Sequence, residues 1–168
     1  AQARFIGEIG MDGSRRFRGS LDIQEPIFRA ALAECGRHPG KVMSIHSRGA
    51  ERRGIELLAT TKHAGVPLLH WFSGGLAELE NAVRIGCWFS VGPAMLAGDK
   101  GRALIARMPL NRVLPETDGP FTSVGGKPLQ PWDAWSVREP LAEIWGMPVA
   151  DTGEQLRQNL HRLLRKHG

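Results

Sequence analysis

Short runs that suit β-strands alternate along the chain with longer stretches of helical period. The strand-like runs are residues 4–10, 41–46, 66–71, 87–91 and 112–117. The stretches whose apolar residues recur at helical spacing are residues 24–37, 51–63, 76–85, 100–107, 137–145 and 151–166. This alternation is typical of βα units, so we expect an α/β fold with a parallel sheet.

The number of strands leaves the topology of this sheet open. Five parallel strands are too few to close an eight-stranded barrel, but they would suffice for an open doubly wound sheet. Pro115 is unfavourable in a central strand, because proline lacks the N–H that a sheet ladder needs. No linker or repeat interrupts the alternation, so residues 1–168 are expected to belong to a single domain.

The composition is that of an ordinary globular domain. The chain has 168 residues, of which 42% are hydrophobic and 23% charged, close to the globular average. No run approaches the roughly 20 apolar residues of a membrane span, and residues 1–5 lack the apolar region of a signal peptide. We therefore expect a cytoplasmic protein with no membrane partner. Cys35 and Cys87 have neither disulfide nor metal-site spacing and are expected to be buried free thiols.

The charge balance makes a polyanionic partner plausible. The net charge is +5 and the sequence pI is about 9.9, and surfaces that bind nucleic acid are usually basic. The arginines are scattered, however, as on any solvated face. Examples are Arg15, Arg16, Arg18, Arg52 and Arg53.

Ionisable residues lie at or near the ends of several predicted strands. Glu8 lies within the first strand, His46 ends the second, His70 lies near the end of the third, and Asp118 follows the fifth. The carboxyl ends of parallel strands gather at one face, so these residues are expected to converge there. Each alone is more often a structural hydrogen-bonding group, but imidazole and carboxylate together suit Zn²⁺, Mn²⁺ or Mg²⁺.

Three further residues are candidates for contact with a substrate. Arg48 follows His46 closely and is suited either to a phosphate or to a surface ion pair. Trp71 is suited to stacking on a base or sugar, or to packing. Ser73 begins a Ser-Gly-Gly turn after His70 that allows a ligand to approach the backbone closely.

Four motifs in order resemble the TatD family of metal-dependent deoxyribonucleases. They are IGEIGMD at residues 6–12, SIHSR at 44–48, LHWFSG at 69–74 and PETD at 115–118. The resemblance covers essentially the whole chain, including Gln24 and Phe28 and the NLHRLL segment at 159–164. It implies a TIM-like barrel that binds two divalent metal ions (Mg²⁺, Mn²⁺ or Zn²⁺) and cleaves DNA phosphodiesters, typically as a 3′-to-5′ exonuclease.

The resemblance also implies a role for each ligand. Glu8 would bridge the two metals, His46 and His70 would ligate the second, and Asp118 would ligate the first and orient the attacking water. Glu8 and Asp118 are therefore the expected catalytic residues. Two ions about 3.5–4 Å apart can stabilise both the attacking and the leaving oxygen.

The chain departs from the family pattern at its beginning. The His-x-His pair expected on the first strand of the family is absent, so we expect a partial barrel of about five βα units, corresponding to strands four to eight. Glu8, His46 and His70 would then complete one metal site, whereas Asp118 would not complete the other. The HWFSG and ETDGPF versions of two motifs are similar to the TatD-like nuclease of Qat anti-phage defence systems, which implies partners among other defence proteins.

Two other functions remain open on the sequence. One is a non-catalytic interaction module that keeps the fold without a working two-metal centre. The other is a related metal hydrolase that acts on a lactone, an amide or an aminoacyl ester, since one fold supports many chemistries.

Overall fold

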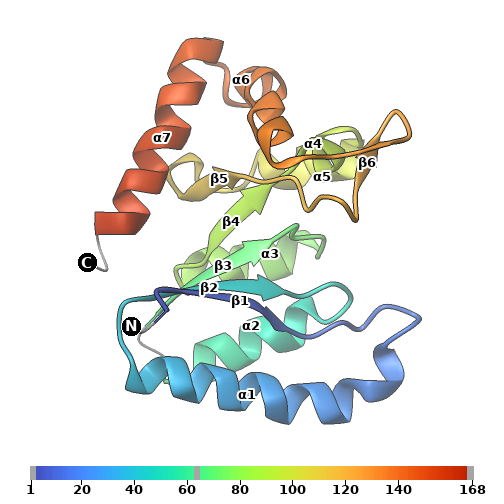
Figure 1. The fold of residues 1–168 in the computed structure, drawn as a ribbon, viewed down its shortest axis with the longest axis vertical. Coiled ribbons are helices and arrows are strands. Elements are labelled where there is room, and N and C mark those ends of the chain that lie inside the picture. Colours follow the sequence, from blue (N-terminus) through green and yellow to red (C-terminus); the bar gives the residue numbers. More distant parts are fainter. Residues whose placement is uncertain (1–2, 63–64, 166–168) are drawn as a thin grey trace.

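The computed structural model describes residues 3–62 and 65–165, and its centre is a five-stranded parallel sheet. The strands follow one another across the sheet in chain order (Figure 1). They are β1 (Phe5–Gly10), β2 (Lys41–His46), β3 (Gly65–His70), β4 (Trp88–Val91) and β5 (Val113–Pro115). A small antiparallel hairpin, β6 (Ser123–Val124) with β7 (Lys127–Pro128), projects after β5.

Helices connect the strands and close the chain. The α-helices are α1 (Leu21–Arg37), α2 (Glu51–Thr60), α3 (Leu76–Arg84), α4 (Pro93–Leu96), α5 (Asp99–Ile105), α6 (Arg138–Trp145) and α7 (Val149–Arg165). Short 3-10 helices are η1 (Arg18–Ser20), η2 (Leu110–Arg112) and η3 (Pro131–Val137). Among the described residues, no helix is long and apolar enough to cross a membrane.

The strand order decides between the two topologies that the sequence left open. In a doubly wound sheet the strand order reverses at a switch point, whereas here each strand pairs with its successor in the chain. Because βα crossovers are right-handed, winding in one direction places the connecting helices on one face. Figure 1 shows α1, α2 and α3 covering that face. The sheet is therefore singly wound, as in barrels.

The two faces of the sheet carry different residues because side chains alternate along a strand. Met43, Ile45, Leu69 and Phe89 point to the helix side, where they join the main core with residues such as Phe28. A second cluster lies on the opposite face and is closed by Leu163 of α7. Its other members are Val42, Val66, Trp88 and Leu114, with Leu68 packed against it.

Most predicted elements are present, with shifted ends. The strand over 41–46 is found as predicted, whereas the strand predicted over 112–117 is only Val113–Pro115. The structure places Pro115 at the end of an outer strand of this sheet, where proline is tolerated. Two predicted helix ends, at residues 63 and 166, lie outside the described residues. The hairpin β6–β7 and the helix η3 were not predicted.

Both cysteines are buried free thiols, as predicted. Burial raises the pKa of Cys87 to about 12, so this thiol stays protonated at neutral pH. Burial also raises the pKa of Cys35. Neither is suited to act as a nucleophile.

Candidate metal centre

Glu8 lies beside the histidines that end the next two strands. The pairing of β1 with β2 shifts register between Ile6 and Ile9, and an irregularity of this kind re-aims a side chain. The Glu8 carboxylate oxygen Oε1 lies 2.9 Å from His46 Nδ1 and 2.7 Å from His70 Nε2.

These three side chains can offer donor atoms to one ion. One ligand atom from each of Glu8, His46 and His70 lies within 4.8 Å of the others. The two imidazole rings are 5.5 Å apart between centroids. The His70 side chain is only 9% exposed, whereas the Glu8 side chain is 50% exposed. A carboxylate with two imidazoles is a donor set that suits a divalent transition metal.

A carboxylate fixes the orientation of His46 from behind. His46 Nε2 lies 3.2 Å from Asp12 Oδ2, on the far side of the ring from Glu8. A proton on Nε2 that is donated to Asp12 leaves the Nδ1 lone pair free to bind a metal. This second contact supports a metal-binding interpretation over a purely structural one.

Asp12 is itself held by its neighbours. Its Oδ1 accepts the Ser14 backbone N–H at 2.7 Å, and its own N–H donates to Gln24 Oε1 at 2.6 Å. Burial raises the pKa of the Asp12 carboxyl, but the hydrogen bonds with Ser14 and His46 outweigh that effect and lower the pKa. Asp12 therefore faces His46 as an anion.

Glu116 lies beside Nδ1 of His70, whereas Glu8 contacts the other ring nitrogen, Nε2. Its Oε1 accepts the Trp71 backbone N–H at 2.8 Å and its Oε2 accepts the Ser90 hydroxyl at 2.6 Å. Oε2 also lies 3.9 Å from His70 Nδ1, which is beyond hydrogen-bonding distance. Burial raises the pKa of this carboxyl.

The contacts of Asp12 and Glu116 were missed by sequence reasoning. A usable signal existed for Glu116, because it lies near the carboxyl end of the strand predicted over residues 112–117, at the edge where the other candidate residues gather.

Asp118 lines the same cavity as the three candidate ligands but is not one of the group whose donor atoms fit a single ion. It follows β5 with a positive φ of 52°, a left-handed conformation that aspartate tolerates better than most residues. Burial raises the pKa of its carboxyl, and the nearby Glu8 charge adds to that effect, against the opposing influence of His70 and His46.

One cavity of about 530 Å³ contains every residue that the sequence singled out for the site. Arg48, Trp71 and Ser73 line it together with the four ionisable residues. Trp71, with φ of 38°, follows the end of β3 and also packs against the main core, so both of its proposed roles are compatible with its position. The Ser73 hydroxyl donates to Glu51 Oε1 at 2.9 Å. Ser47, Phe121 and Thr122, which the sequence did not single out as site residues, complete the lining.

A singly wound parallel sheet with carboxylates and imidazoles at its carboxyl edge defines the class of α/β proteins whose active sites gather at strand ends. Comparison with known families narrows this class. The model described as "TatD related DNase" matches residues 1–165. The chain belongs to the TatD family.

Individual relatives agree with this assignment. The human protein named deoxyribonuclease TATDN3 is 30% identical over 164 residues, which cover 96% of this chain and 60% of that protein. The 3'-5' ssDNA/RNA exonuclease TatD of Dickeya dadantii is 33% identical over 177 residues, covering 98% of this chain and 66% of that protein. The chain thus spans about 60% of the length of the first of these relatives.

Solved structures share the fold. The Escherichia coli TatD homolog YJJV superimposes with a TM-score of 0.83 at 27% identity, covering 94% of this chain and 62% of that one. A TatD family hydrolase from Entamoeba histolytica gives a TM-score of 0.80 at 17% identity, covering 96% of this chain and 63% of that one, and supports the fold alone.

Proposed function

We propose that this protein is a divalent-metal-dependent nuclease that hydrolyses DNA phosphodiester bonds. The observation that carries the proposal is the convergence of Glu8, His46 and His70 in one cavity, with Asp12 orienting His46. Relatives named as deoxyribonuclease and as 3'-5' ssDNA/RNA exonuclease support nucleic acid as the substrate.

Glu8, His46 and His70 would hold an ion, because their donor atoms already lie together and His46 has an orienting partner. Mg²⁺, Mn²⁺ and Zn²⁺ are the candidates, and the histidines favour Mn²⁺ or Zn²⁺. A bound ion would polarise the phosphoryl oxygens and lower the pKa of water. In the complete protein we propose two ions, with Glu8 between them and this chain supplying one full ligand set.

Each remaining residue of the cavity has a proposed task. Asp118, whose pKa is raised by burial, would orient the attacking water and accept its proton. Arg48, exposed at the mouth of the cavity, would bind a non-bridging phosphate oxygen. Trp71 and Ser73 would contact the sugar or base next to the scissile bond.

Finer features of the proposal follow the sequence motifs. We propose that the five strands correspond to strands four to eight of an eight-stranded barrel, and that cleavage proceeds from 3′ to 5′. The HWFSG and ETDGPF motifs favour a cytoplasmic role in Qat-type anti-phage defence, beside other proteins of such a system.

The direct test is an exonuclease assay of the complete protein with Mn²⁺ or Mg²⁺, alongside the His70→Ala variant. We expect metal-dependent release of nucleotides by the unmodified protein and a loss of more than about 100-fold in the variant, since ligand loss should exceed the 10–100-fold typical of outer-shell changes. Undiminished activity in His70→Ala would refute the ligand assignment. Cleavage of amides or lactones, with no cleavage of DNA, would show that the protein acts on a different class of substrate.

A further inference from the structure

The segment between β1 and α1 contains four consecutive exposed residues, Arg15, Arg16, Phe17 and Arg18, the last of which begins η1. We call these four residues the arginine loop. Within the described part of the chain, none of its three guanidinium groups forms an ion pair or side-chain hydrogen bond. The Arg16 guanidinium lies 5.0 Å from the centre of the Phe17 ring. The loop therefore presents three positive charges to solvent without neutralising partners.

The neighbouring arginines of α2 are different. Arg53 binds Glu25 through two nitrogens, at 2.6 and 2.7 Å, and Glu56 through a third at 3.1 Å. Arg52 lies 3.3 Å from Glu56. Arg52 and Arg53 are thus paired with carboxylates of the described chain, whereas the arginines of the arginine loop are not.

The segment just before the arginine loop is held against Arg48, which lines the cavity that contains the candidate metal ligands. The Gly13 N–H donates to the Arg48 carbonyl at 2.8 Å, and a side chain at Gly13 would collide with the Gly49 carbonyl oxygen. At the other end of the loop, Gln24 Nε2 donates to the Phe17 carbonyl at 3.3 Å and to Ser20 Oγ at 2.9 Å. The backbone on both sides of the arginine loop is therefore held in place, and its first contact is with the backbone of Arg48.

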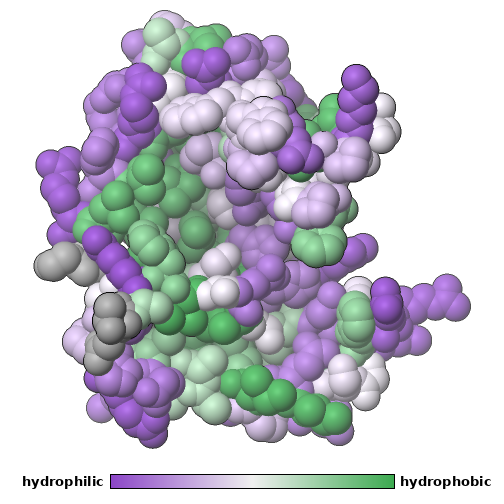
Figure 2. Space-filling model, viewed as in Figure 1, coloured by the Kyte–Doolittle hydropathy of each residue, from purple (hydrophilic) through white to green (hydrophobic). Residues whose placement is uncertain are grey.

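An aromatic residue faces solvent at the rim of the same cavity. Phe121 is 89% exposed and lines the cavity, three residues after Asp118. The residues after Phe121 lead into the β6–β7 hairpin. Lys127 of this hairpin forms no ion pair with any described residue. Figure 2 shows the surface hollowed between the region of the β1–α1 loop and that of this hairpin.

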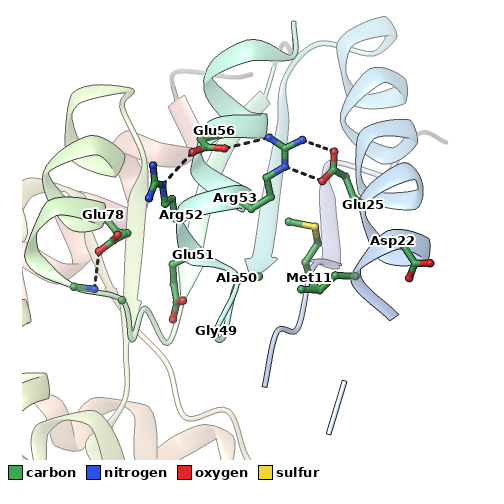
Figure 3. Close-up of a pocket in the computed structure, with 13 residues that line it drawn as sticks. Met11, Asp22, Glu25, Gly49, Ala50, Glu51, Arg52, Arg53, Glu56 and Glu78 are labelled. Atoms are coloured by element: carbon green, nitrogen blue, oxygen red, sulfur yellow. Dashed lines mark hydrogen bonds and ion pairs between the residues drawn. The ribbon is translucent and has the colours of Figure 1, made fainter. Parts of the chain in front are cut away.

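The adjoining groove, at the ends of α1, α2 and α3, would repel a polyanion. It is lined by five carboxylates (Asp22, Glu25, Glu51, Glu56 and Glu78) against two arginines, both of them paired (Figure 3). A phosphate backbone that leaves Arg48 is therefore disfavoured from following this groove.

We propose that single-stranded nucleic acid enters the cavity between the arginine loop, which binds its phosphates, and Phe121, which stacks on an unpaired base. The inference rests on the proposed function for the identity of the substrate. It assigns backbone and base recognition to opposite rims of the cavity. Aromatic stacking tolerates any base, and arginine suits phosphate.

The test is binding of a fluorescent oligothymidylate to the complete protein in EDTA, measured by anisotropy over a range of salt concentrations. Replacing Arg15, Arg16 and Arg18 together by glutamine should lower the slope of log affinity against log salt by about 2, at about 0.7 per lost phosphate contact on a single strand. Replacing all three by lysine should retain the slope. Arg165→Gln, exposed at the end of α7, is the matched control and should also retain it.

Phe121→Ala should weaken binding of the oligothymidylate about tenfold with its salt slope unchanged, since stacking is uncharged. Phe121→Trp should preserve affinity, and binding to a duplex should not depend on residue 121. An unchanged slope in the glutamine variant, or equal losses for single strand and duplex in Phe121→Ala, would overturn the inference. Because EDTA removes divalent metal, these experiments measure binding without cleavage. A protein that binds as described but cuts no nucleic acid would refute the proposed function and not this inference.

Discussion

The two halves of the sheet face that lies opposite α1, α2 and α3 differ sharply in chemistry. Near the amino ends of the strands this face carries Val42, Val66, Trp88 and Leu114, which pack with Leu163 of α7. Near the carboxyl ends, the same face carries a cluster of polar residues on β2, β3 and β4 and just after β5. Its members are His46, His70, Ser90 and Glu116, beside Glu8.

The difference shows that position along a strand, more than the face, decides what a residue does here. Val42 and His46 lie four positions apart on one strand, as do Val66 and His70, so each pair points the same way. The apolar end is sealed by α7, where Asn159 Nδ2 donates to the Leu110 and Val113 carbonyls at 2.7 and 2.8 Å. The charged end is open to a cavity. The apolar end stabilises the fold, whereas the polar end is available to bind a ligand.

The largest expected effect comes from the apolar end. Leu163→Ala should lower the free energy of unfolding by about 2–5 kcal/mol, because it leaves a cavity beneath Val42 and Trp88. Urea denaturation measures this loss. The matched control is Leu160→Ala on the same helix, which is 45% exposed and should cost much less. A change in metal affinity of the folded Leu163→Ala protein would contradict the separation of the two ends.

A smaller effect is expected from Asp12, behind the candidate metal ligand His46. Asp12→Asn should weaken metal binding about 10–100-fold, because an amide N–H facing His46 Nε2 favours the proton on Nδ1, where the metal lone pair is needed. Isothermal titration with Mn²⁺ measures the change. The control is Asp22→Asn, an exposed carboxylate for which the described structure records no ion pair. Equal affinity in Asp12→Asn and in the unmodified protein would remove Asp12 from the centre.

The smallest effect concerns the pH dependence of stability. Burial raises the pKa of Glu116 above its ordinary value of 4.5, so the folded state holds this proton more tightly than the unfolded state. Its contribution to the free energy of unfolding is present below pH 4.5 and is lost as the pH rises through the raised pKa. Glu116→Gln should remove that part of the decline, measured by urea denaturation in EDTA across this range. A decline as steep as in the unmodified protein would show that other groups cause it.

Much of this arrangement could be predicted from local sequence. The strand ending at His46 was found at its exact bounds, because an apolar run is followed by a Ser-Arg-Gly turn. The ligand candidates Glu8, His46, His70 and Asp118 followed from the rule that parallel strands present their carboxyl ends together. The structure brings all four into one cavity, while their role as metal ligands stays a prediction.

The rest depended on contacts that no local pattern encodes. Asp12 matters because it meets His46 across strands, and Glu116 because it fills the space behind His70 and beneath Trp71. The sequence also did not distinguish the unpaired arginines of the arginine loop from Arg52 and Arg53, which form ion pairs in the folded structure. The β6–β7 hairpin did have a local signal in Gly125 and Gly126, both with positive φ, which sequence reasoning passed over.

We propose that Glu8, His46 and His70 hold a divalent ion, and calorimetric counting of bound ions tests this most directly. The complete protein, freed of metal by chelation, would be titrated with Mn²⁺ or Zn²⁺ beside His46→Ala and a control, His38→Ala, whose exposed ring pairs with Glu34 at the end of α1. We predict that His46→Ala loses one bound ion while His38→Ala binds as the unmodified protein does. Full stoichiometry and unchanged affinity in His46→Ala would contradict the account.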